Sequence, residues 1–252
     1  MSYSSGGLIS ATDYNNLVGT ATTSGTINYV WSTGNGQFGY GQTALSQSAA
    51  TSGLVTATQW ATAINTLNNI KTHQSGSGTG IGAPAAGSLV AYLSTLSSSI
   101  TTINTNKLNF ATQGSTVTGS SFAASFSATN NTTYGPATFA TRTATFASAD
   151  QARYFFNAGG QLNLVISSVT NVDGTSRSAD AQTIIGTGLG GVSAFRATTN
   201  GGRTGTGGTL VADTSIGYFD LTTSGQQLLK LNSAGATYVY YGDYITVSAY
   251  SN

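Results

Sequence analysis

The chain has 252 residues and a formal net charge of +1, and only 6% of its residues are charged. Nucleic-acid binders need a basic surface that displaces counterions, so the sequence predicts no nucleic-acid partner. Attachment to a membrane surface through basic residues is disfavoured for the same reason. The chain contains no cysteine, which excludes disulfides, thiolate metal sites and cysteine nucleophiles.

The rest of the composition indicates where such a protein works. No segment approaches the roughly 18 apolar residues of a membrane-spanning helix. The N-terminus has neither the basic start nor the apolar stretch of a secretion signal. We therefore expect synthesis in the cytoplasm of a host cell, without a signal peptide. Ser, Thr, Gly, Ala and Asn make up the bulk of the chain, which suits a component of an assembly that works outside the cell.

Three elements are predicted in the first part of the chain. Residues 8–18 have the pattern of a short helix, with Ser10 or Thr12 as its N-cap. Residues 27–42 alternate aromatic and polar side chains around Asn35-Gly36, which predicts an aromatic-glycine hairpin rather than a phosphate-binding loop. Apolar residues at helical spacing predict a helix over residues 59–74. A lone histidine makes no metal site, so we expect His73 to pack at the end of this helix.

A heptad pattern follows a glycine-rich hinge at residues 75–87. The remaining positions of residues 89–107 are mostly Ser, Thr and Asn, which are weak helix formers. The narrow apolar stripe favours a helix that packs against identical helices of other chains, in a trimer if the protein forms a fibre, although the mixture of Leu and Ile does not fix the number of chains. A core helix folded back on an earlier one is the alternative. The predicted oligomer interface consists of Leu89, Leu93, Leu96, Ile100 and Ile103.

From about residue 112 the sequence is typical of β-structure. Strand patterns occur at residues 162–166, 192–198, 208–222, 226–232 and 236–250, and short capped helices are expected at residues 148–160 and 178–191. Strands at this spacing predict an antiparallel β-sandwich. The fold class is therefore α+β. We expect an N-terminal helix and hairpin region for attachment (residues 1–75), the hinge and heptad helix (76–111) and the sandwich (112–252).

The sequence offers little for catalysis, so we expect no enzyme, no metal site and no cofactor. All seven acidic residues are Asp, and helix starts and a turn account for four of them. Nothing in the sequence brings Asp213, Asp220 and Asp243 together as the carboxylate pair of a glycosidase. Tyrosines crowd the last predicted strand region. They could stack on a sugar, but we favour packing in the core and against a neighbouring subunit. The candidate glycan contacts are Tyr240, Tyr241 and Tyr244.

Several motifs together resemble virion structural proteins of tailed bacteriophages. They are the aromatic-glycine segment at residues 29–42, the helix start Thr58-Gln59-Trp60, the dipeptide His73-Gln74 and the segment ARYFFNAGG at residues 152–160. The likeness is closest to tail-fibre or adaptor-type proteins of phages of cyanobacteria and marine bacteria, and it spans residues 8–75 and about 140–252. It implies a homo-oligomer with other virion proteins as partners, and no catalytic residues to carry over. Gln37 stands where the resemblance would place an acidic residue.

These observations predict a structural component of a phage virion. We expect an oligomeric tail fibre or a tail- or baseplate-associated protein that acts by assembly and adhesion. Two alternatives stay open: a carbohydrate-binding or depolymerising receptor-binding protein that contacts a host surface glycan, and a capsid or neck decoration protein. The predicted attachment region contains Trp31, Phe38, Tyr40 and Trp60.

Overall fold

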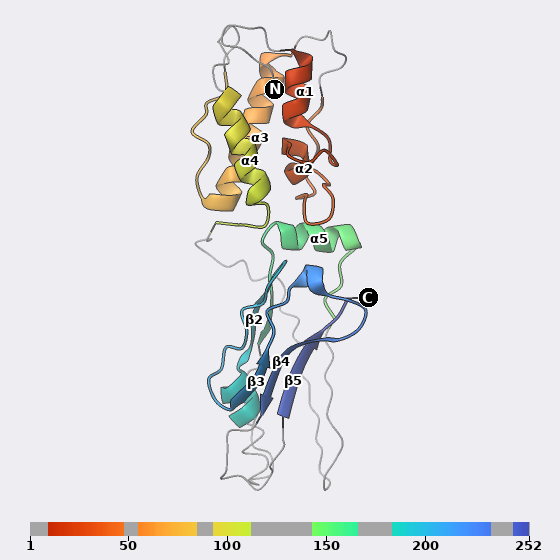
Figure 1. The fold of residues 1–252 in the computed structure, drawn as a ribbon, viewed down its shortest axis with the longest axis vertical. Coiled ribbons are helices and arrows are strands. Elements are labelled where there is room, and N and C mark those ends of the chain that lie inside the picture. The colour runs from red at the N-terminus through yellow and green to blue at the C-terminus, as the bar shows by residue number, and fades with distance from the viewer. Residues whose placement is uncertain are drawn as a thin grey trace.

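The computed structural model describes residues 10–47, 55–84, 93–111, 143–165, 183–232 and 244–251. Figure 1 shows an elongated molecule with helices α1–α4 at one end and the strands at the other, and with α5 lying across between them. The chain is α+β, as predicted, with helices and antiparallel sheets. Among the described residues, no helix combines the length and the apolar character that crossing a membrane requires.

Helices α1 (Ala11–Val18) and α3 (Ala57–Ser75) begin at the hydroxyl residues that the sequence suggests. In α1 the Ser10 hydroxyl accepts the Asp13 N–H, and the Asp13 carboxylate accepts the Ser10 N–H. Thr56 and Gln59 form the same reciprocal capping box at the start of α3. Such a box satisfies two N–H groups that a helix start would otherwise leave unpaired.

The predicted strand at residues 27–31 is wrong, because these residues form helix α2 (Ile27–Trp31). Strand alternation would place Asn28 on the outer face, but the structure buries it with Ile27 and Val30. The Asn28 carboxamide donates to the Gly19 and Leu45 carbonyls and accepts the Leu45 N–H. A buried amide with three hydrogen bonds fixes the helix in a way that side-chain alternation does not reveal.

The heptad residues that are described pack inside their own chain. In α4 (Leu93–Thr105), Leu96, Ile100 and Ile103 are at most 4% exposed and join one core with α3. These three predicted interface residues therefore follow the intramolecular alternative. Leu89 lies outside the described residues, and only the backbone of Leu93 is described. Threonines on the outer face of α4 bond to carbonyls four residues earlier.

Two apolar cores divide the molecule. The first joins α1–α4 and includes Ile81 of the predicted hinge, so the described residues from 10 to 107 form what we call the helical half. The second joins α5 (Ala149–Asn157) to the strands and includes Leu108; we call the described residues from 108 to 251 the sheet half. The hinge and the heptad helix thus share the core of the N-terminal region.

The sheet half contains two small antiparallel sheets. Strand β1 (Leu162–Val165) pairs with β2 (Gly191–Phe195), and β3 (Thr209–Asp213), β4 (Gln226–Asn232) and β5 (Tyr244–Ala249) form a meander. Each strand lies within or next to a predicted one. A π-helix, η1 (Thr183–Leu189), precedes β2, and a 3₁₀ turn, η2 (Tyr218–Asp220), lies between β3 and β4. The core side chains of this half include Phe195, Leu229 and Leu231.

Replacing Leu96 with alanine tests the packing of α4. The side chain is fully buried, so we expect Leu96→Ala to lower the free energy of unfolding by about 2–5 kcal/mol and to leave the oligomeric mass of the protein unchanged. Ser97→Ala, on the exposed face of the same helix, is the control and should change stability by less than about 0.5 kcal/mol. Chemical denaturation and native mass spectrometry measure both. A change of oligomeric mass in Leu96→Ala would favour the alternative in which this helix packs against identical helices of other chains.

Candidate functional site: the joint between the two halves

Residues 33–42 form a tight loop, here called the glycine loop, that returns along α2. The Tyr40, Gly41 and Gln42 N–H groups donate to carbonyls of residues 30–32 at 2.9–3.1 Å. A Cβ on Gly39 would lie 2.2 Å from the Thr33 carbonyl oxygen, and Gly39 has a φ of +98°. Only glycine fits this crossing of the loop on itself. The loop is therefore held in one shape that presents its carbonyls outward.

Two polar side chains of helix α5 donate hydrogen bonds to these carbonyls. Arg153 and Asn157 are four residues apart, so they lie on one face of the helix. Arg153 Nη1 donates to the Thr33 carbonyl at 2.8 Å and to the Phe38 carbonyl at 2.7 Å. Asn157 Nδ2 donates to the Gly39 carbonyl at 3.0 Å. We call this set of contacts between α5 and the glycine loop the joint.

Close packing accompanies the hydrogen bonds of the joint. A Cβ on Gly41 would lie 2.5 Å from the Tyr154 ring, so the absence of a side chain lets this ring lie on the loop backbone. Gly159, just after α5, makes the same kind of contact with the Phe110 ring. The Gly41–Tyr154 contact therefore adds close packing across the joint, while the Gly159–Phe110 contact holds α5 within the sheet half.

The same helix is anchored in the sheet half through Phe156. This side chain is 2% exposed. Its ring stacks on Tyr218 of η2 at a centroid distance of 4.5 Å and contacts Phe195 of β2 edge-on at 6.1 Å. One short helix thus presents arginine and asparagine to the helical half and a phenylalanine to the core of the sheet half.

The helical side of the joint is fixed by Tyr40. Its hydroxyl donates to the Lys107 carbonyl at 3.0 Å and accepts from Gln74 Nε2 at 3.0 Å. Burial raises the pKa of Tyr40 to about 12. The His73 ring packs edge-on against the Tyr40 ring, and burial lowers the pKa of this histidine. His73 therefore packs at the end of α3, as predicted.

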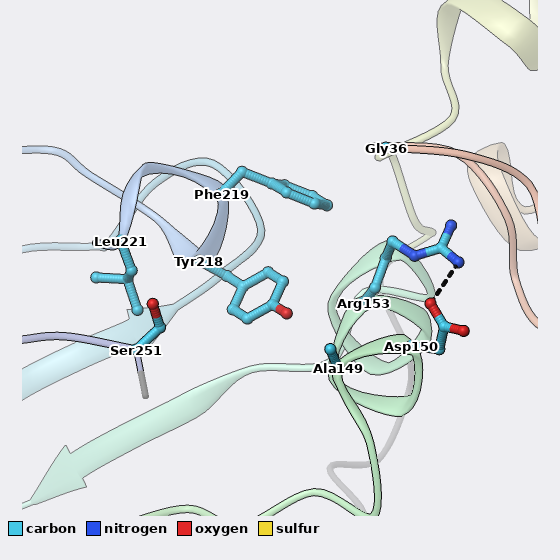
Figure 2. Close-up of a pocket in the computed structure, with 8 residues that line it drawn as sticks. All are labelled: Gly36, Ala149, Asp150, Arg153, Tyr218, Phe219, Leu221 and Ser251. Atoms are coloured by element: carbon cyan, nitrogen blue, oxygen red, sulfur yellow. Dashed lines mark hydrogen bonds and ion pairs between the residues drawn. The ribbon is translucent and has the colours of Figure 1, made fainter. Parts of the chain in front are cut away.

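A pocket of about 300 Å³ lies beside the joint. Figure 2 shows Arg153 and Asp150 on one side, with the Tyr218 hydroxyl pointing toward them and Gly36 above. Arg153 Nη2 and Asp150 Oδ1 are 3.0 Å apart, but the Asp150 side chain is 66% exposed. An exposed ion pair of this kind contributes little to stability, so the carbonyl contacts of Arg153 matter more.

The four predicted attachment residues lie in or against the core of the helical half. Trp60 and Tyr40 are buried, and Trp31 and Phe38 are partly buried. Trp31 Nε1 donates to the Thr43 carbonyl, while the Phe38 ring lies between Tyr29 and the Lys107 ammonium. These residues therefore hold the helical half together, and the joint itself is made by carbonyls of the glycine loop.

Of the three candidate glycan contacts, the structure describes only Tyr244, because Tyr240 and Tyr241 lie outside the described residues. Tyr244 is 58% exposed, and the Lys230 ammonium lies 4.4 Å from the centre of its ring. The three residues are therefore not shown together as a site.

The two residues that make the joint, Arg153 and Asn157, were not singled out as a site from the sequence. The available signal was two polar residues four positions apart in the otherwise aromatic segment RYFFN. Such spacing shows a shared helix face, but it does not show which distant loop the face meets.

The described residues contain no group of three or more His, Cys, Asp or Glu side chains that could hold a metal ion. Asp220 accepts the Gly217 N–H at 2.8 Å, a local contact within η2. Comparisons of the chain with family profiles, with curated proteins and with solved structures find no match.

Replacing Arg153 with alanine tests the joint. It removes two charge-assisted hydrogen bonds from a side chain that is 14% exposed, so we expect a loss of about 2 kcal/mol of stability. Hydrogen exchange of residues 33–41 should also become faster, because the loop loses its partner. Asp150→Asn, which removes the exposed ion pair and one negative charge from the first turn of α5, is the control and should cost less than about 1 kcal/mol. Equal effects of the two variants would contradict the assignment.

The raised pKa of Tyr40 predicts a loss of stability in alkali. Its value rises from 10.0 to about 12 on folding. Between these pH values the folded state holds a proton that the unfolded state has released, so stability falls as pH rises from about 10 to about 12. Tyr40→Phe should flatten this part of the pH profile in urea denaturation. Tyr14 and Tyr218, whose pKa values burial also raises, stay in both proteins, and an unchanged slope would contradict the prediction.

Proposed function

We propose that this chain is a structural component of a tailed-bacteriophage virion, an oligomeric tail fibre or a tail- or baseplate-associated protein that acts by assembly and adhesion and not by catalysis. The joint is the observation that carries the proposal. Two of the segments on which the phage resemblance rests contact each other directly, although Phe38 and Arg153 are 115 positions apart. A fixed connection between two cores suits a protein that transmits position or force along a particle.

In this proposal the helical half attaches to the particle or to sister subunits, and the sheet half extends away from it. The elongated arrangement in Figure 1, with α5 between the two halves, supports this division. We take the two sheets as the layers of the predicted sandwich, because Phe195 of β2 shares a core with Leu229 and Leu231 of β4.

Self-association then needs a surface other than α4, whose described apolar residues are buried in the chain. The sheet half offers one, because β3 is an edge strand among the described residues and an unpaired strand edge invites pairing with another chain. Leu210 and Val211 of this strand are 40% and 52% exposed. We propose that copies of the chain, three in a fibre, associate at this edge.

Location on a particle tests the central claim. Mass spectrometry of purified virions should find the chain at several copies per particle, and an antibody against it should label the tail in electron micrographs. Labelling of the capsid or neck would favour the decoration alternative. Absence of the chain from purified particles would contradict a structural role.

Replacing Val211 with lysine tests the proposed assembly surface. The side chain is 52% exposed, so the variant should fold, while a lysine charge in the edge strand should oppose pairing and lower the oligomeric mass. Thr95→Lys, on the exposed face of α4, is the matched control and should keep the parent mass. Native mass spectrometry measures both proteins. If both variants keep the oligomeric mass of the unmodified protein, the assembly surface does not include the edge of β3.

One observation favours the carbohydrate-binding alternative. Tyr244 exposes an aromatic side chain, and the Lys230 ammonium lies near its ring. An aromatic face with a polar neighbour can stack on a sugar. Binding of the full-length chain to a glycan array, with loss of binding in Tyr244→Ala, would support this role beside or in place of simple assembly.

A further inference from the structure

We propose that Asn35 is a site of spontaneous covalent modification. Its carboxamide is lost through a cyclic succinimide, and the aspartate and isoaspartate products loosen the joint. The chain contains two Asn-Gly pairs, Asn35-Gly36 and Asn200-Gly201. From the structure we expect Asn35 to react and Asn200 to be protected.

The chemistry needs only water. The Gly36 amide nitrogen attacks Cγ of Asn35, so a new N–Cγ bond forms, the Cγ–Nδ2 bond breaks, and ammonia leaves with the proton of the amide. Water then opens the five-membered ring at one of its two carbonyls. Opening at one carbonyl gives aspartate, and opening at the other gives isoaspartate, in which the main chain runs through the side-chain carbon.

None of the described residues protects Asn35 from this reaction. Asn35, Gly36 and Gln37 are all exposed. The only hydrogen bond between this Asn-Gly pair and a described residue is that from the Phe38 N–H to the Asn35 carbonyl. The carboxamide and the Gly36 nitrogen are therefore free to meet. Gly36 has a φ of +57°, and no atom lies within 4 Å of the position of a Cβ, so the space beside this glycine is open.

Asn200 is held in place by its surroundings. It is 8% exposed, and its Nδ2 donates to the Thr214 carbonyl at 2.7 Å and to the Ile216 carbonyl at 3.2 Å. Its Oδ1 accepts the Gly202 N–H at 2.8 Å. The carboxamide must break these bonds before it can turn toward its own main chain, so this pair serves as an internal control.

Modification of Asn35 should weaken the contacts of Arg153 with the glycine loop, because of where this residue lies. Arg153 Nη1 bridges the Thr33 and Phe38 carbonyls, and residue 35 lies in the chain between them. Isoaspartate lengthens this stretch of backbone by one carbon, so the two carbonyls no longer keep their spacing. Both products also add a carboxylate next to Gly36, which shares a pocket with Asp150 and Arg153. That carboxylate competes with the carbonyls for the guanidinium.

The test is ageing of the full-length protein in mildly alkaline buffer, followed by peptide mapping and enzymatic labelling of isoaspartate. We expect product at Asn35 to exceed product at Asn200 by more than about fivefold, the factor expected if even one hydrogen bond of Asn200 must break first. In the chain unfolded by urea the two sites should react at similar rates. An unmodified Asn35 in the folded protein, with reaction of the unfolded chain, would overturn the proposal.

A second measurement tests the consequence. Hydrogen exchange of residues 33–41 should be faster in the aged protein than in the fresh one. Asn35→Gln is the matched control, because it keeps the glycine whose φ is +57° and its longer side chain closes a ring on the Gly36 nitrogen far more slowly, so the aged variant should keep its slow exchange. Modified Asn35 with unchanged exchange would overturn the claim that the product loosens the joint.

Discussion

The arrangement of the whole molecule depends on one guanidinium group and the two carbonyls that it holds. Arg153 joins Thr33 to Phe38 from a helix that is itself anchored by Phe156 in the opposite core. A hydrogen bond to a charged donor is stronger than one between neutral groups, and here the acceptors are backbone carbonyls, so they depend on the shape of the loop and not on its side chains. Glycine at positions 39 and 41 is required because the chain and the Tyr154 ring approach the loop too closely for any side chain.

Hydroxyl groups make many of the local hydrogen bonds of the described helices. Ser10, Thr56 and Ser148 cap three helices. Three threonine hydroxyls on α4 donate hydrogen bonds to carbonyls of the same helix. Ser and Thr are poor in helix interiors when they compete for backbone groups. The α4 helix tolerates them because Leu96, Ile100 and Ile103 are buried against α3, so packing and not propensity stabilises it.

Local signals in the sequence located most elements correctly. Caps and apolar spacing predicted α1, α3 and α5, and turn residues with alternation predicted the strands. The predictions that failed or stayed open concern partners. The stripe on α4 fits a neighbouring chain or α3 equally well, since periodicity shows a face but not what covers it. The α2 segment has strand-like alternation, and only the tertiary hydrogen bonds of Asn28 explain its helix. The pairing of Arg153 with a loop 115 positions away has no local signal at all.

The scarcity of charge has a consequence for the conditions in which this fold works. Dissolved ions screen attractions between exposed charges, and they act much less on buried apolar contacts and backbone hydrogen bonds. Arg153–Asp150 is the one ion pair among the described residues, and its carboxylate is largely open to solvent. The connection between the halves rests on packed rings, on glycine backbone and on the hydrogen bonds of one guanidinium, that of Arg153, whose side chain is only 14% exposed. Such an architecture keeps its shape across a wide range of salinity, from fresh water to brine.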